Sequence, residues 1–147
     1  MVCLTSSSQA SDSKFRLGIQ GTHFLSGLSG IVSLSDSWGV GGVIDFSAEA
    51  VAFRVVNRFH ERAYWNAYGE GTVALWKDNG PRSWKLWRDQ YPDSYNRHVG
   101  AGVGLGLEYD WRGLSPSLPP LGWNIEVGVN VIPEVDLALG VGVHWKF

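Results

Sequence analysis

The sequence predicts an all-β fold, an eight-stranded antiparallel up-and-down transmembrane β-barrel. From residue 13 onward, apolar residues alternate with small or polar ones, which is the period of a β-strand. The 147-residue chain also combines 19 Gly with 13% aromatic residues, an uncommon pairing in a soluble enzyme. The mean hydropathy of −0.07 argues against a bundle of membrane-spanning helices, as does the longest stretch free of charged residues, 17–35, which is diluted with Gly and Ser.

The length fits one domain, preceded by a short segment of different composition. Residues 1–10 carry no charge and end in a small-x-small triplet, as signal-peptidase sites do. We expect residues 1–10 to be a signal-peptide remnant or a disordered tail, and residues 11–147 to form the barrel domain. The one cysteine, Cys3, lies in the first segment, so no disulfide framework is expected. The net charge of −2 offers no footprint for nucleic acid.

The three clearest strands are 98–111, 123–131 and 137–147. One face of these segments has 18 positions, all apolar or aromatic, and the 16 opposite positions are 7 Gly, one Ala and 8 polar or charged residues. A soluble barrel would turn the apolar face inward and would not require glycine on its wet face. A small membrane barrel does the reverse, because lipid contacts the apolar face and a narrow lumen has little room for side chains. The pattern therefore predicts apolar rows outside and glycine and charge inside.

The first half of the chain fits the same pattern with more exceptions. Strands are predicted near 15–19, 30–34, 38–46, 51–59 and 64–76, which completes the count of eight. Asn57 interrupts one outward row. One set of connections is predicted at Gly27, 47–49, 77–97 and 133–135, and the opposite set at 35–37, 60–62 and 112–120.

These features resemble the small outer-membrane β-barrels of Gram-negative bacteria, of the OmpA-like and OmpX-like kind, in the outer membrane protein beta-barrel domain group. The most specific element is the C-terminal strand, which ends in Val143, Trp145 and Phe147 and is similar to the signal that the barrel-assembly machinery recognises. The resemblance covers about residues 13–147. It implies an outer-membrane location, termini in the periplasm, a monomer, and contacts with outer-membrane lipids and lipopolysaccharide.

Charged residues on the predicted inner face are the first candidate site. Buried charges must be paired, so we expect an ion-pair network that plugs the lumen. Its expected members are Arg16, Asp45, Arg54, Arg58, Glu70, Glu108, Asp110, Glu126 and Lys146. A gated conduit is the sharper alternative, which eight strands disfavour because they leave no aqueous channel.

The connection 77–97 is the second candidate, because it mixes basic and aromatic residues. Such groups can bind phosphates and sugars of lipopolysaccharide through charge-assisted hydrogen bonds and stacking. The possible ligand contacts are Arg82, Trp84, Lys85, Trp87 and Arg88. Packing of this segment over the barrel rim is the alternative, and it is slightly favoured.

Aromatic residues near predicted strand ends are expected to anchor the barrel at the membrane interfaces. They are Trp38, Trp76, Trp111, Trp123, Trp145 and Phe147.

The sequence offers little for catalysis. Lipid A deacylases that resemble this chain in size carry a His-x-Ser-Asn stretch, which His23, His60, His98 and His144 all lack. The histidines do not have metal-ligand spacing, so no metal and no cofactor is expected. The expected function is therefore structural or surface-binding. A soluble lipocalin-like carrier with inward apolar rows and a lipid A-modifying enzyme remain as alternatives.

Overall fold

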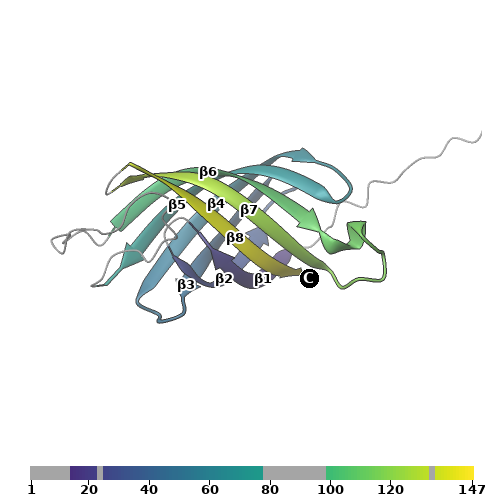
Figure 1. The fold of residues 1–147 in the computed structure, drawn as a ribbon, viewed down its shortest axis with the longest axis horizontal. Coiled ribbons are helices and arrows are strands. Elements are labelled where there is room, and N and C mark those ends of the chain that lie inside the picture. The colour runs from purple at the N-terminus through teal and green to yellow at the C-terminus, as the bar shows by residue number, and fades with distance from the viewer. Residues whose placement is uncertain (1–13, 23–24, 78–98, 133–134) are drawn as a thin grey trace, which may run out of the picture.

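A computed structural model describes residues 14–22, 25–77, 99–132 and 135–147. It confirms the predicted all-β, up-and-down barrel, because eight antiparallel strands follow one another in chain order and close into a barrel (Figure 1). The strands are β1 (Phe15–Gly21), β2 (Ser26–Ser33), β3 (Trp38–Asp45), β4 (Ala50–Glu61), β5 (Trp65–Trp76), β6 (Val99–Asp110), β7 (Leu121–Ile132) and β8 (Asp136–Lys146). None of the described residues belongs to a helix long and apolar enough to cross a membrane.

The barrel closes where its first and last strands pair. The register between β1 and β8 runs from Arg16 opposite Lys146 to Gly21 opposite Val141. Beyond the strand itself, the backbone N–H of Phe147 donates to the carbonyl of Phe15 at 2.9 Å. Each described strand therefore has a partner on both sides, and the sheet has no free edge.

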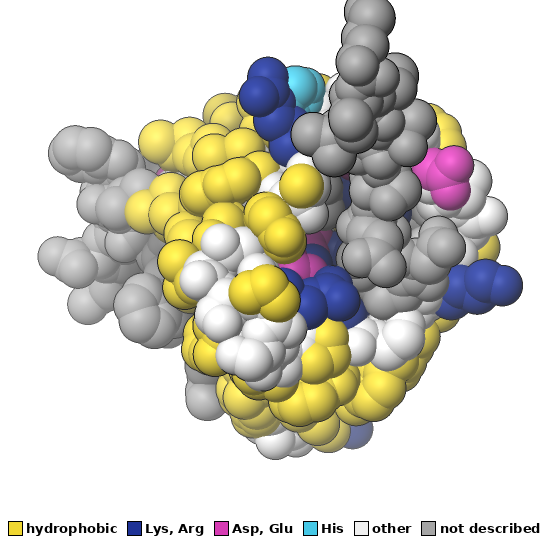
Figure 2. Space-filling view, turned by 90° about the vertical axis from the view of Figure 1, so that its right-hand side faces the viewer, with side chains coloured by type: hydrophobic (Ala, Val, Ile, Leu, Met, Phe, Trp, Pro, Cys, Tyr) yellow, Lys and Arg dark blue, Asp and Glu magenta, His cyan; other side chains and the backbone are white. Residues whose placement is uncertain are grey.

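Most large apolar side chains of the strands face outward, and most of their charged side chains face inward. Val141 and Trp145 are 56% and 41% exposed, whereas Glu108 is 5% exposed. Figure 2 views the barrel from the end where the C-terminus lies, and hydrophobic side chains surround a centre in which basic and acidic groups are visible. A lipocalin-like carrier needs apolar rows that face inward, whereas the apolar rows of this barrel face outward.

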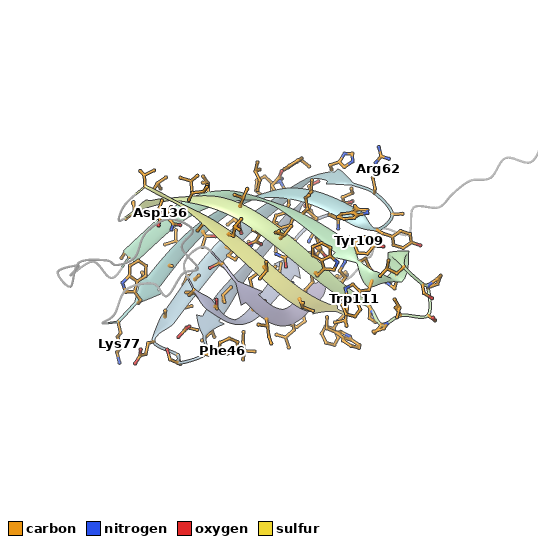
Figure 3. The ribbon with its side chains drawn as sticks, in the orientation of Figure 1. Phe46, Arg62, Lys77, Tyr109, Trp111 and Asp136 are labelled. Carbon is orange, nitrogen blue, oxygen red and sulfur yellow. The ribbon has the colours of Figure 1, made fainter. Side chains whose placement is uncertain are left out.

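The two ends of the barrel carry different connections. Arg62, Tyr109 and Trp111 lie near the end where the C-terminus is found, which we call the terminal end (Figure 3). Lys77 and Asp136 mark the opposite end, which we call the distal end.

Two predicted turns are wrong. Gly27 lies inside β2, where a side chain would collide with the backbone carbonyl of Ile44 on β3. This glycine therefore allows β2 and β3 to approach each other closely. The first turn instead closes through Thr22, whose N–H donates to the carbonyl of Leu25 at 2.8 Å. His60 and Glu61 also belong to a strand, β4, and the chain turns at residues 62–64.

The connection between β6 and β7 is long but ordered. Trp111–Gly113 forms a short 3₁₀ helix, and the carboxylate of Asp110 caps it by accepting from the backbone N–H of Arg112. The segment then returns to the barrel, where the N–H of Lys146 donates to the carbonyl of Pro120 at 2.8 Å. This connection therefore extends the sheet at the terminal end.

Trp76 contradicts its predicted role as an interface anchor, because it points inward and is 7% exposed. It packs in an apolar cluster that fills the distal part of the interior with Leu25, Val43, Ala52 and Ala74. Inward and outward positions alternate, and Trp76 falls on the same face as Ala74. The other predicted anchors lie outward or are half-buried, at Trp38, Trp111, Trp123, Trp145 and Phe147.

Candidate functional site

The interior between the distal apolar cluster and the terminal end is filled by charged side chains. Eight of the nine residues expected in the network are buried there, and these eight comprise four cations and four carboxylates. They are Arg16, Arg54, Arg58, Glu70, Glu108, Asp110, Glu126 and Lys146. Formal charge is therefore balanced across this set.

A terminal cluster joins β1, β6 and β8. Arg16 forms an ion pair with Glu108. Lys146 Nζ lies 2.7 Å from Glu108 Oε1 and 3.1 Å from Asp110 Oδ2. Arg112, outside the strands, adds a second cation to Asp110 at 2.7 Å, and these hydrogen bonds raise the pKa of the Arg112 guanidinium. Each carboxylate of the cluster therefore contacts two cations.

A central cluster is organised by Arg54 on β4. Its guanidinium pairs with Glu70 on the adjacent strand β5 and reaches Glu126 on β7, which is not a neighbour of β4 in the sheet. Tyr68 donates its hydroxyl to Glu126 Oε1 at 2.6 Å. The amide of Asn124 donates to the same oxygen at 2.8 Å and to the Tyr68 hydroxyl at 2.9 Å. The cluster therefore ties together opposite walls of the barrel.

Two expected members behave differently. Asp45 is half-buried at the distal end of β3, and its carboxylate accepts hydrogen bonds from the backbone N–H and the hydroxyl of Ser47. Asp45 is the last residue of β3, so its side chain stabilises the following turn and does not join the central cluster. Arg58 does lie inside, but it donates to the carbonyl of Asp36 at 3.1 Å and to the hydroxyl of Ser33 at 3.0 Å.

Inward glycines make room for this network. A methyl group on Gly106 would overlap with the ring of Tyr68, and one on Gly142 would overlap with the amide of Gln20. At Gly140 it would lie 2.8 Å from Glu126 Oε2. The glycines of the alternating pattern therefore stand opposite the large polar side chains, and a bulkier residue would force these side chains to shift.

The interior also contains a close serine and histidine. Ser29 Oγ and His144 Nε2 lie 2.7 Å apart, a separation suited to a nucleophile and its base. Both side chains are buried, and the adjacent cavity of about 20 Å³ has room for about one water molecule. Ser29 and His144 therefore satisfy each other as hydrogen-bonding partners inside the barrel.

The described residues contain no group of three His, Cys, Asp or Glu side chains that could hold a metal ion. The predicted ligand contacts Arg82, Trp84, Lys85, Trp87 and Arg88, and the predicted signal remnant 1–10, lie outside the described residues. Val143, Trp145 and Phe147 point outward at the barrel seam, and the rings of Phe147 and Phe15 lie 6.0 Å apart.

Sequence reasoning missed several polar and aromatic partners. Tyr68 and Asn124 share the inward face with Glu70 and Glu126, so the alternation already contained the signal for them. On the outer face, Trp65 contacts Tyr109 and Trp123, with ring centroids 4.6 and 6.3 Å apart. This contact joins β5, β6 and β7 near the terminal end. It depends on the register of these strands, which cannot be derived from a single sequence.

Comparison of the chain with models of protein families, with curated proteins and with solved structures finds no match. A function for this chain is therefore inferred from its fold and its side-chain contacts.

Proposed function

We propose that this protein is an integral outer-membrane β-barrel of a Gram-negative bacterium, similar to the OmpA-like and OmpX-like barrels. It acts as a monomer with a structural or surface-binding role and not as a catalyst. The observation that carries the proposal is the combination of an exposed apolar wall with a buried, charge-balanced interior.

The exposed wall is costly in water. Large apolar side chains are exposed on all eight strands, whereas the largest apolar patch of a soluble monomer covers only about 300–600 Å². In lipid the same wall is favourable, and a closed barrel leaves no strand edge unpaired in the hydrocarbon. The wall therefore supports a membrane location.

The filled interior supports a structural role over a conduit. The central cluster crosses the barrel from β4 to β7, and the apolar cluster around Trp76 fills the distal part. Opening a path would separate buried ion pairs, which costs several kcal/mol, on the order of 3–5 for one pair. We therefore place any binding function on the outer surface.

Two kinds of contact follow from the proposal. Lipopolysaccharide would bind the basic and aromatic residues of 77–97, and the barrel-assembly machinery would bind the strand that ends in Val143, Trp145 and Phe147. A variant in which Arg82, Lys85 and Arg88 are replaced by Gln is expected to bind lipopolysaccharide micelles more weakly, with unchanged folding. Equal binding by this variant would show that residues 77–97 do not bind lipopolysaccharide.

The membrane proposal is tested by refolding the chain with and without detergent. We expect β-rich circular dichroism and heat-dependent migration in detergent gels only when micelles or vesicles are present. A folded, monodisperse protein in plain buffer would contradict the proposal.

A further inference from the structure

The terminal end of the barrel contains a pocket that none of the arguments above uses. It has a volume of about 30 Å³ and is lined by Arg16, Arg58, Arg62, Lys146, Glu61 and Asp110. Glu61 and Arg62 are exposed, so the pocket opens to solvent at the barrel mouth, beside the β4–β5 turn. Figure 2 views this end, where basic and acidic groups lie within the apolar rim.

The pocket has a surplus of positive charge. Four cations and two carboxylates line it, and one of these carboxylates, Asp110, already contacts both Lys146 and Arg112. Arg16 and Lys146 share Glu108 as a further partner. These pairs use Asp110 and Glu108, and no ion pair in the described part of the chain joins Arg58 or Arg62 to a carboxylate. Glu61 is the one remaining carboxylate of the lining, so these two arginines leave a surplus of one positive charge.

The contacts of these two arginines agree with this. Arg58 is 8% exposed, yet its hydrogen bonds go to a backbone carbonyl and a serine hydroxyl, which carry no charge. Arg62 donates to His60 Nε2 at 3.3 Å. In addition, Arg16 Nε is buried and has no acceptor in the described part of the chain. A buried guanidinium such as that of Arg58 is destabilising without an anion to compensate it, so the pocket favours a further negative charge.

We propose that this pocket binds a phosphate group. A phosphate oxyanion carries the charge that the lining lacks and accepts the forked hydrogen bonds that guanidinium groups donate. By volume the pocket holds about two water molecules, and its open side lets the rest of a larger molecule remain outside. Tyr64 and Asn66, which also line it, supply neutral hydrogen-bonding groups.

The phosphate has two possible sources, free inorganic phosphate or the headgroup of a membrane lipid. The outward cluster of Trp65, Tyr109 and Trp123 lies toward the same end, and such aromatic residues favour the headgroup level of a bilayer. The site goes beyond the proposed function, because it requires only the pocket and not insertion into a membrane.

The first test titrates inorganic phosphate into the protein refolded in a neutral detergent, with calorimetry as the readout. We expect saturable binding of one phosphate, weakened about tenfold in Arg62→Gln, which removes one charge-assisted contact. Lys14→Gln is the matched control, because Lys14 is exposed, precedes β1 at the same end and does not line the pocket. Circular dichroism checks that both variants fold.

The second test distinguishes the lipid source. Phosphatidylglycerol is added to the same micelles, and native mass spectrometry measures the lipid that remains bound. Bound lipid that is lost in Arg62→Gln and retained in Lys14→Gln, without saturable inorganic phosphate binding, assigns the site to a headgroup. Absence of both signals, or binding of either kind that Arg62→Gln leaves unchanged, overturns the proposal.

Discussion

Individual residues of the interior are matched in charge and in volume. Arg54 compensates two carboxylates from different strands, and Gly106 leaves the space that the ring of Tyr68 occupies. Both relations join residues that are distant in the sequence. Because the interior is crowded, a change at one of these positions acts directly on its partner.

Replacing Arg54 by Met is expected to lower the free energy of unfolding by about 3–5 kcal/mol, because Glu70 and Glu126 lose their buried counter-charge. Urea unfolding in lipid vesicles, followed by tryptophan fluorescence, measures this change. Adding Glu70→Gln and Glu126→Gln to the same variant should restore most of the loss. A single variant as stable as the natural protein would contradict the ion-pair account.

Replacing Gly106 by Ala is expected to lower the free energy of unfolding by about 1–3 kcal/mol, because the added methyl group forces the Tyr68 ring to move. Gly71→Ala on the outer face is the control, since a methyl group there has no described neighbour within 4 Å. The same urea titration compares the two variants. Equal effects would show that the space beside Tyr68 is not what the glycine provides.

The strands differ in how far the sequence predicted them. For β6 and β8 the predicted segments 98–111 and 137–147 agree with the observed ends within one residue, because alternation persists to the last residue. Gly27, His60 and Glu61 were misassigned to turns, since glycine and polar residues usually mark turns. In this barrel the sheet continues through them, and glycine serves close packing of strands.

The candidate site was predictable only in part for a similar reason. Alternation identifies which side chains face inward, but not which of them meet across the interior. The contact between Arg54 on β4 and Glu126 on β7 depends on the stagger of the closed barrel. Asp45 has the inward parity and still binds Ser47, because its height along the barrel decides its partner.

The seam between β1 and β8 gives a prediction for assembly. Phe147→Ala keeps the backbone bond to Phe15 and removes the ring contact, so the refolded barrel should lose only about 0.5–1.5 kcal/mol of stability. If the assembly machinery recognises this ring, the amount of barrel in the outer membrane of cells should fall much further than that small loss explains. Quantitative immunoblots of membrane fractions measure it.

Leu114→Ala serves as the control for this prediction, because Leu114 is an exposed apolar residue in the β6–β7 connection. It should leave the membrane level unchanged. A normal amount of the Phe147→Ala variant in the outer membrane would show that the ring contributes only to packing and is not recognised by the assembly machinery.

The whole molecule is a barrel with an apolar outer surface and a largely polar interior, the reverse of a soluble protein. Exposed Val, Leu, Ile and Phe side chains cover the wall, and the buried charges balance inside. Such an arrangement is stable when hydrocarbon surrounds the wall and is prone to aggregation in water. Whether lipid or water surrounds the wall therefore determines whether this protein is a membrane barrel.

Site-directed fluorescence quenching tests that property most directly. In a Cys3→Ser background, a fluorophore is attached at Val141→Cys on the wall, or at Ser117→Cys in the exposed β6–β7 connection, before the chain is folded into vesicles. We predict that brominated lipid chains quench the probe at 141 and that aqueous iodide quenches the probe at 117. Quenching of the probe at 141 by iodide as strongly as at 117, with no effect of the brominated lipid, would contradict the account.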